Sequence, residues 1–253
     1  MIFGSHNSCT YGSLQGCCMG MMLPWTQNQT LTLQEQLDRG VQWLDFRLSY
    51  SPSSGEIYLS HSLLTEHRFV DILQQLIRRC EQRQEEHPLL YIHLRVDVRD
   101  RSHASVMRSI LSSILRSAEP YLCVRGMCSA TIQETSRNQK NKLLFYCADG
   151  TIQDFRIFSL DLAPSVSFWD VAEHDMESRL LQMTERFQAQ ADGPFLFPRD
   201  RMILFDYSST APLWWTDREQ VALIKRYKDT ILRTQPSILA GNHVEELMQL
   251  FAA

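Results

Sequence analysis

The chain has 253 residues, a net charge of −4 and a hydrophobic fraction of 44%. A chain of this length and composition can bury a sizeable core, and an α/β barrel of about this size is ordinary as one domain. The acidic balance and the lack of a nucleic-acid-binding motif argue against a nucleic-acid partner. No apolar run approaches the roughly 20 residues that span a membrane.

The start of the chain has no basic segment followed by a long apolar stretch, so no signal peptide is expected. The chain as given is therefore interpreted as intracellular, either cytoplasmic or peripheral to membranes. Its seven cysteines have no repeated spacing, which favours reduced thiols over a disulfide framework. The paired C-x-x-C spacings that a zinc site would need are absent.

Strands and helices are predicted to alternate along most of the chain. A short apolar strand begins at Ile2 and places His6 at its end. Further strands are predicted at residues 41–48, 57–61, 89–96, 121–124, 143–147, 202–207 and 237–240. Helices are predicted at residues 32–39, where Thr32 and Glu35 form a capping-box pattern, and at 69–83, 102–117, 176–190, 217–234 and from 243 onward.

This alternation predicts a mainly parallel sheet covered by helices. Charged residues end early and late strands alike, whereas an open sheet would gather them at one switch point. No Gly-rich phosphate loop is present. We therefore expect a single α/β domain over residues 1–253, built as a (β/α) barrel of the TIM type.

Four side chains suited to acid–base chemistry lie at predicted strand ends, where barrel enzymes place their chemistry. They are His6, Asp45, Arg47 and His61. Two histidines with opposed roles are what cleavage of a phosphodiester by an internal hydroxyl requires. Asp45 and Arg47 share one face of a strand, so the carboxylate can aim the guanidinium at a phosphoryl oxygen. The alternatives are structural histidines and a structural salt bridge.

Two later strands add further candidates. Arg95 and Asp97 share a face at the end of the strand at 89–96. Asp206 follows an apolar strand, where an unpaired carboxylate would be costly, and a histidine N–H is a natural partner for it. A serine hydrolase is disfavoured because no G-x-S-x-G elbow occurs. A thiol enzyme is disfavoured because Cys9 is near His6 only in sequence.

These residues belong to motifs that resemble the catalytic X region of phosphatidylinositol-specific phospholipases C. The motifs are G-S-H-N-S at 4–8, R-G-V-Q-W-L-D-F-R at 39–47 and L-S-H at 59–61. The stretch M-I-L-F-D-Y at 202–207, followed by a Trp-containing loop and a helix, resembles a late barrel strand of the bacterial-type enzymes. The resemblance implies a distorted TIM-type barrel and a two-step reaction through a cyclic inositol phosphate.

The resemblance also implies roles for five residues. His6 would be the general base on the inositol 2-hydroxyl, oriented by Asp206. His61 would be the general acid for the diacylglycerol oxygen. Arg47 would stabilise the transition state electrostatically, and Asp45 would orient Arg47 or the acid side.

Four more residues are expected to face the substrate by the same resemblance. They are Asn7, Arg95, Lys140 and Tyr207. Bacterial-type members usually carry Asp at the position of Asn7, where it supports the general acid. Here we expect Asn7 to hydrogen-bond His61 without supplying a charge.

Calcium is not expected, and no metal or other cofactor is predicted. Animal members of the family bind calcium through an Asn after the histidine and acidic groups on the next strands, a plan that Asn7 and Asp45 fit. Arg47 and Arg95 stand where two acidic ligands would be, and calcium requires several oxygen ligands. The arginines are therefore predicted to replace the metal.

A phospholipid substrate implies contact with a membrane surface. Trp25, Trp214 and Trp215 lie in predicted loops, and tryptophan favours the membrane interface. Trp25 could instead be part of a buried loop plug, and the pair could pack under the helix at 217–234. No protein partner can be read from the sequence.

Two other functions stay open. One is a catalytically silent module that binds a lipid or an inositol phosphate. The other is a phosphodiesterase for another headgroup, such as a glycerophosphodiester, although that class normally has acidic metal ligands that the sequence does not supply.

Overall fold

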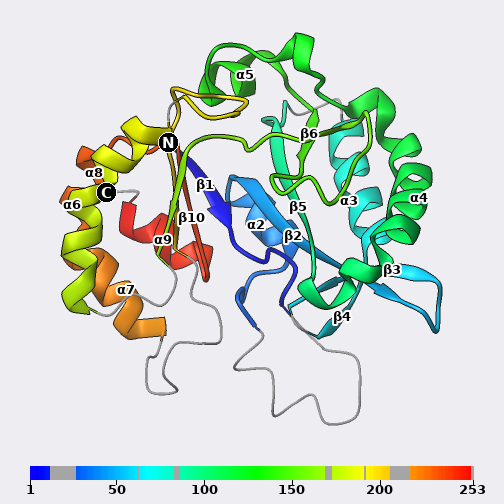
Figure 1. Cartoon of the computed structure of the whole chain (residues 1–253), viewed down its shortest axis with the longest axis horizontal. Helices are drawn as coiled ribbons and strands as arrows, with labels where there is room; N and C mark the ends of the chain where they lie inside the picture. Colours follow the sequence, from blue (N-terminus) through cyan, green and yellow to red (C-terminus); the bar gives the residue numbers. More distant parts are fainter. Residues whose placement is uncertain are drawn as a thin grey trace.

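A curved, mainly parallel sheet forms the centre of the computed structural model, which describes residues 1–11, 27–61, 63–82, 86–168, 173–190, 192–205 and 217–251 (Figure 1). The strands are β1 (Ile2–Ser5), β2 (Val41–Ser51), β3 (Glu56–Ser60), β4 (Leu64–Arg68), β5 (Leu90–Val96), β6 (Leu143–Tyr146), β7 (Ile157–Phe158), β8 (Ser165–Ser167), β9 (Met202–Phe205) and β10 (Ile238–Gly241). Their order is β7-β6-β5-β2-β1-β10-β9-β8, with every pair on this path parallel. Strands β3 and β4 extend β2 as an antiparallel hairpin.

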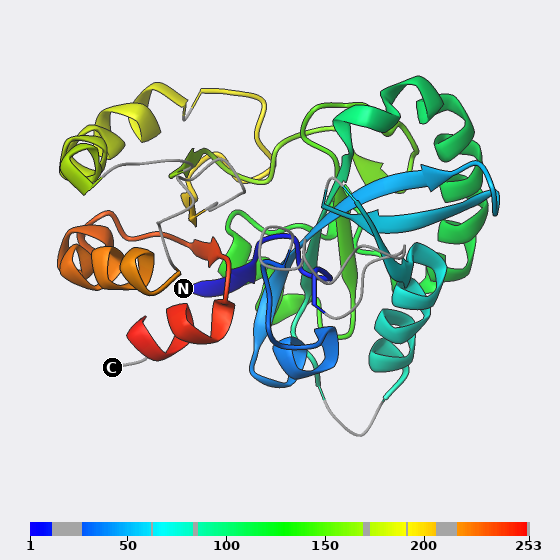
Figure 2. The same ribbon diagram turned by 90° about the horizontal axis from the view of Figure 1, so that it is seen from below.

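Helices cover the outside of this sheet, with α3 and α4 at one side and α6, α7 and α8 at the other (Figures 1 and 2). The helices are α2 (Leu33–Asp38), α3 (Phe69–Glu81), α4 (Ala104–Leu115), α5 (Ile132–Asn138), α6 (Glu173–Gln190), α7 (Asp217–Arg226), α8 (Lys228–Arg233) and α9 (Val244–Phe251), with 3-10 turns η2 (Val98–His103), η3 (Arg116–Tyr121) and η4 (Arg125–Met127). The predicted barrel of the TIM type is confirmed in a distorted form, with β7 and β8 as the edges of the described sheet. No helix in the described part of the chain is both long enough and apolar enough to cross a membrane.

Some predicted elements differ in detail. The predicted strand at 121–124 is a 3-10 turn that ends at Tyr121, followed by a single bridge from Leu122 to Leu143. Pro120 lies in that turn, and its fixed φ suits the turn just before the predicted strand. The predicted helix at 217–234 is two helices that meet at Tyr227. The capping box of Thr32 and Glu35 at α2 is confirmed.

The inside of the barrel is apolar at the amino ends of its strands. Trp43 and Tyr91 are buried there, and the Trp43 indole N–H donates at 2.8 Å to the hydroxyl of Tyr146, the buried last residue of β6. Gly4 makes room for this packing, because a Cβ at Gly4 would lie 2.7 Å from the Trp43 ring and 2.8 Å from the Ala240 Cβ. Polar side chains therefore have to lie further along the strands, towards their carboxyl ends.

The register of the central strands decides which side chains meet there. Along the parallel pair β2–β5, Asp45 lies opposite His93 and Arg47 lies opposite Arg95. Because side chains alternate along a strand, all four share one face of the sheet. Trp43 and Tyr91 precede them on that face, so the polar layer sits directly above the apolar one.

Candidate active site

His6 occupies the end of the central strand β1. Its side chain is fully buried. Its backbone N–H donates to the Gly241 carbonyl of β10 at 3.0 Å, and its carbonyl accepts from the Gln29 amide at 2.7 Å. Asn7 follows with a left-handed φ of 45°, which turns the chain away from the sheet. The imidazole is thus fixed at the carboxyl end of the barrel.

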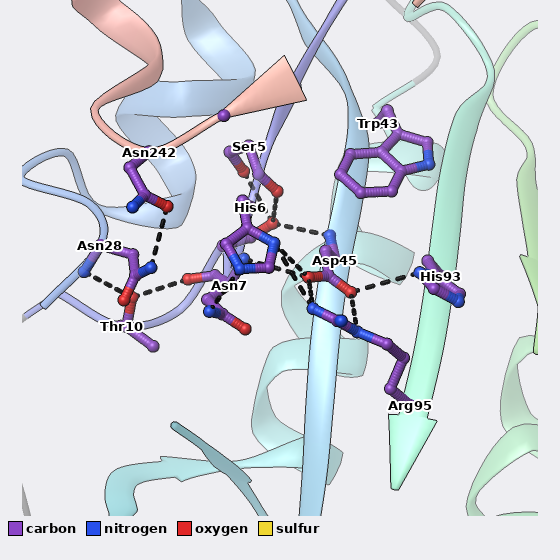
Figure 3. A network of polar contacts seen from close by, with 12 residues as sticks. Ser5, His6, Asn7, Thr10, Asn28, Trp43, Asp45, His93, Arg95 and Asn242 are labelled. Atoms are coloured by element: carbon purple, nitrogen blue, oxygen red, sulfur yellow. Dashed lines mark hydrogen bonds and ion pairs between the residues drawn. The ribbon is translucent and has the colours of Figure 1, made fainter. Parts of the chain in front are cut away.

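A second set of contacts holds the turn that follows His6. The Asn7 carbonyl accepts from the Thr10 hydroxyl at 2.8 Å, and that hydroxyl accepts from the Asn28 N–H at 3.0 Å. The Asn28 amide in turn donates to Asn242 at 2.8 Å (Figure 3). Three separate segments therefore keep Asn7 in a backbone conformation that Asn tolerates better than most residues.

Asp45 of β2 is the charged centre of the site. Its side chain is fully buried, and its Oδ2 lies 2.8 Å from His6 Nδ1 (Figure 3). Backbone bonds align the two segments: the Ser8 N–H donates to the Asp45 carbonyl at 2.9 Å, and the Asp45 N–H donates to Ser8 Oγ at 2.9 Å. The Asn7 N–H also reaches Oδ2, at 3.3 Å.

Two side chains of β5 share the same carboxylate. Arg95 donates from Nε to Asp45 Oδ1 at 2.9 Å and from Nη2 to Oδ2, which is a bidentate pair. His93 Nδ1 lies 3.3 Å from Oδ1. Burial alone would raise the pKa of Asp45, but the Arg95 charge and the hydrogen bonds of His6 and His93 hold that pKa well below its usual range. Asp45 is therefore an anion at neutral pH.

The partners of His6 define its state at neutral pH. A carboxylate at Nδ1 requires a proton on that nitrogen, which leaves Nε2 with its lone pair. The Asn7 amide Nδ2 lies 2.8 Å from Nε2 and donates to it. Asn7 is 2% exposed, and its Oδ1 has no hydrogen-bond partner among the described residues. His6 is therefore poised to accept a proton at Nε2 from any hydroxyl that displaces the amide.

These contacts correct two expectations. Asp45 was expected to orient Arg47 or the acid side, but its contacts within the described chain are with His6, Arg95, His93 and the Asn7 N–H. The Asn7 amide was expected to reach His61, but it lies on His6. The physical reason is that β1 lies beside β2 in the sheet, which brings the carboxylate to His6, the residue that follows β1.

Arg47 lies on β2, and His61 directly follows the neighbouring strand β3. Arg47 is half-buried, on the face that carries Asp45 and Arg95. His61 is buried and follows β3, where its N–H donates to the Leu63 carbonyl at 3.0 Å. Since Leu59 pairs with Leu48, extending the antiparallel register places the residue before His61 opposite Arg47. The hairpin therefore returns His61 towards the arginine.

Lys140 is placed elsewhere, so its prediction as a substrate-facing cation is wrong. It lines a cavity of about 270 Å³ together with Met1, Gln42 and Pro88. Met1 and Pro88 precede β1 and β5, and Gln42 is the second residue of β2, so the cavity lies at the amino ends of the strands, opposite the end that carries His6. A residue just before a parallel strand has to lie at that end. The predicted site and interface residues Trp25, Asp206, Tyr207, Trp214 and Trp215 lie outside the described residues.

His93 is a site residue that the sequence analysis missed. It precedes Arg95 by two positions, so the same alternation that grouped Arg95 with Asp97 also places His93 on the inner face. Within the described residues, no group of three or more His, Cys, Asp or Glu side chains is arranged to hold a metal ion.

Comparison with known proteins identifies the fold. No protein-family model and no curated protein sequence matches the chain. The phosphatidylinositol-specific phospholipase C from Listeria monocytogenes aligns with a TM-score of 0.62 and 14% identity, covering 98% of this chain and 92% of that one. The F249X mutant of the Staphylococcus aureus enzyme gives 0.60 and 12%, covering 96% and 85%. Another structure of the S. aureus enzyme gives 0.60 and 12%, covering 98% and 91%.

The likeness spans nearly the whole chain, so the resemblance predicted from the motifs is confirmed at the level of the fold. The distorted barrel is shared with these bacterial phospholipases C. Activity and substrate depend on the site itself.

Proposed function

We propose that the chain is a phosphodiesterase of the phospholipase C type that cleaves phosphatidylinositol into diacylglycerol and a cyclic inositol phosphate. The observation that carries the proposal is the buried pair of His6 and Asp45, at 2.8 Å, at the carboxyl end of the barrel. Arg95 and Arg47 lie on the same inner face and supply the positive charge that a phosphate ester requires. The neighbours of known structure are named for this substrate.

In the first step, His6 Nε2 takes the proton of the inositol 2-hydroxyl, and the oxygen attacks phosphorus. Asp45 stabilises the imidazolium that forms, as a carboxylate does beside a histidine base. The bond from phosphorus to the diacylglycerol oxygen breaks, and His61 gives that oxygen a proton. Each proton transfer contributes on the order of 10²–10⁴-fold.

In the second step, the roles reverse. His61 takes a proton from water, the resulting hydroxide opens the cyclic phosphate, and His6 returns its proton to the inositol 2-oxygen. The product is inositol 1-phosphate, and both histidines regain their starting states. In our proposal Asp206 adds to the support of His6, a role that rests on the sequence resemblance alone.

The arginines stabilise the charge that develops on the phosphoryl oxygens. Arg47 lies on the inner face of β2, beside the hairpin strand β3 that precedes His61. Arg95 is 27% exposed and bound to Asp45, so its position is fixed before substrate arrives. Fixed cations directed at a developing anion lower its energy without reorganisation. We propose that they act in place of a metal ion, because Arg95 already supplies a positive charge at the Asp45 carboxylate.

The substrate is presented by a lipid surface, so the enzyme has to act at a membrane interface. We propose that Trp25, Trp214 and Trp215 enter the headgroup region, where the amphipathic indole ring is favoured.

A second function, binding of a lipid headgroup without turnover, is favoured by one observation. The Asn7 amide occupies His6 Nε2, the atom that has to accept the substrate proton. In the binding module this hydrogen bond would persist, and the barrel would hold an inositol phosphate without cleaving it.

The test is release of diacylglycerol from phosphatidylinositol vesicles in excess EDTA. The proposal expects turnover by the wild type and loss of at least about 10²-fold in His61→Ala. Lys140→Ala is the matched control, because Lys140 lies at the opposite end of the barrel, and it should keep wild-type activity.

Vesicle binding without turnover, with or without calcium, would instead identify the binding module. Turnover of glycerophosphodiesters but not of phosphatidylinositol would identify another headgroup. Loss of activity in EDTA that calcium restores would refute the metal-independent mechanism.

A further inference from the structure

The His93 side chain faces the Asp45 carboxylate, but the proposed reaction gives it no role. Its side chain is 16% exposed, and Nδ1 lies 3.3 Å from Asp45 Oδ1. Its ring stacks on Tyr146, with centroids 4.6 Å apart and planes at 9° (Figure 3 shows His93 beside Asp45). The Tyr146 ring is itself held by the Trp43 indole, which donates to its hydroxyl. The His93 ring is thus fixed facing the carboxylate.

Asp45 is shared between two histidines and one arginine. Oδ2 contacts His6 and Arg95, whereas Oδ1 contacts Arg95 and His93. If both rings were protonated, three positive charges would surround one negative charge. Two groups that compete for one carboxylate in this way titrate as a coupled pair, and a proton on one disfavours a proton on the other.

Other charged and aromatic groups face His93 besides Asp45. Asp161, in the segment between β7 and β8, interacts with His93 electrostatically. Burial raises the pKa of Asp161, while the His93 charge acts in the opposite direction. Arg95, on the same strand, opposes a charge on either ring, and Tyr146 contributes a ring face. His93 therefore has a second carboxylate nearby, besides the one that it shares with His6.

We infer that His93 is a positioning residue that competes with His6 for the Asp45 carboxylate. Because of this competition, His6 gains its second proton at a lower pH than it would if His93 did not contact Asp45. The inference rests on the proposed function, in which a second proton on His6 would prevent it from acting as the base. The competition itself can be measured without any turnover.

Two substitutions separate the parts of the interaction. In His93→Asn, the amide nitrogen takes the position of Nδ1, so a hydrogen-bond donor to Asp45 remains but cannot become charged. In His93→Phe, the ring that stacks on Tyr146 remains but the donor is lost. If His93 only packs, His93→Phe should behave like the wild type.

The measurement is a nitrogen-15 NMR titration of the His6 ring in the wild type and both variants. In both variants His6 should gain its second proton at a pH about one unit higher than in the wild type, the scale of interacting pairs. The shift should be larger in His93→Phe, because His6 and Arg95 are then the only side chains among the described residues that bind Asp45. In the wild type, the His6 curve should show a second inflection where His93 titrates, which requires no variant.

The acid limb of kcat/KM should move to higher pH by the same amount. Identical His6 titrations in the wild type and both variants, with a single inflection in the wild type, would overturn the inference. A shifted His6 titration in a protein that cleaves no phosphodiester would support it and refute the proposed function.

Discussion

Asp45→Asn is the most informative single substitution, because it keeps the shape of the side chain and removes its charge. In the wild type the carboxylate accepts from His6 Nδ1 and from the Arg95 guanidinium. An asparagine oxygen can still accept from Arg95, but its NH₂ would then face His6. The imidazole would have to accept at Nδ1 and carry its proton on Nε2, so no lone pair would remain for the substrate hydroxyl.

The expected loss in kcat is about 10³–10⁴-fold, the scale seen when a carboxylate that fixes a histidine tautomer is replaced by an amide. The substitution also breaks a buried ion pair, which costs about 3–5 kcal/mol. Because Arg95 is 27% exposed, water can solvate part of its charge. We therefore expect about 3 kcal/mol, or roughly 6–12 °C in Tm for a chain of this size.

The assay is steady-state release of soluble inositol phosphate, with thermal unfolding measured on the same samples. Asp38→Asn is the control, since Asp38 pairs with Arg79 at the surface and neither measurement should change. Activity of Asp45→Asn within tenfold of the wild type, with a lowered Tm, would refute the reasoning. Asp45 would then be a structural anion that does not fix the tautomer of His6.

The same substitution predicts a pH dependence of stability. The pKa of Asp45 is lowered in the folded protein, so its stabilisation is fully present above its unfolded pKa of about 4 and is lost as the pH falls through the folded value. The difference in unfolding free energy between wild type and Asp45→Asn should therefore be constant above about pH 5 and shrink below about pH 4. A difference that grows on acidification would contradict the assignment.

Three further substitutions test other parts of the structure. Asn7→Asp places a second carboxylate beside the general base and should move the acid limb of kcat/KM to higher pH by about one unit; an unchanged profile would mean that this side chain does not face the base. Gly4→Ala places a Cβ 2.7 Å from the Trp43 ring and should cost about 1–3 kcal/mol in urea unfolding, whereas Gly126→Ala meets nothing within 4 Å and should be neutral. Alanine at the tryptophan pair 214–215 should weaken sedimentation with vesicles and leave turnover of a soluble substrate nearly intact, and equal loss of both would indicate a folding role.

Periodicity in the sequence was enough to predict the architecture of the chain. Alternating strands and helices predicted the barrel, and the capping box predicted where α2 begins. The same rules placed His6 at a strand end and put Asp45 and Arg47 on one face. These predictions succeed because they depend on local geometry: the alternation of side chains, the turn of a helix and the satisfaction of its first N–H groups.

Partnerships between residues were decided by the tertiary structure. Asp45 meets His6 because β1 and β2 are neighbours, and Arg95 meets Asp45 because β5 lies on the other side of β2. The predicted position of Lys140 was wrong because strand direction, and not charge, decides at which end of the barrel a residue lies. A sequence pattern determines which face and which end of a strand a side chain occupies. Which strand lies alongside, and in what register, is determined by the packing of the whole sheet, and that packing made Asp45 the partner of His6.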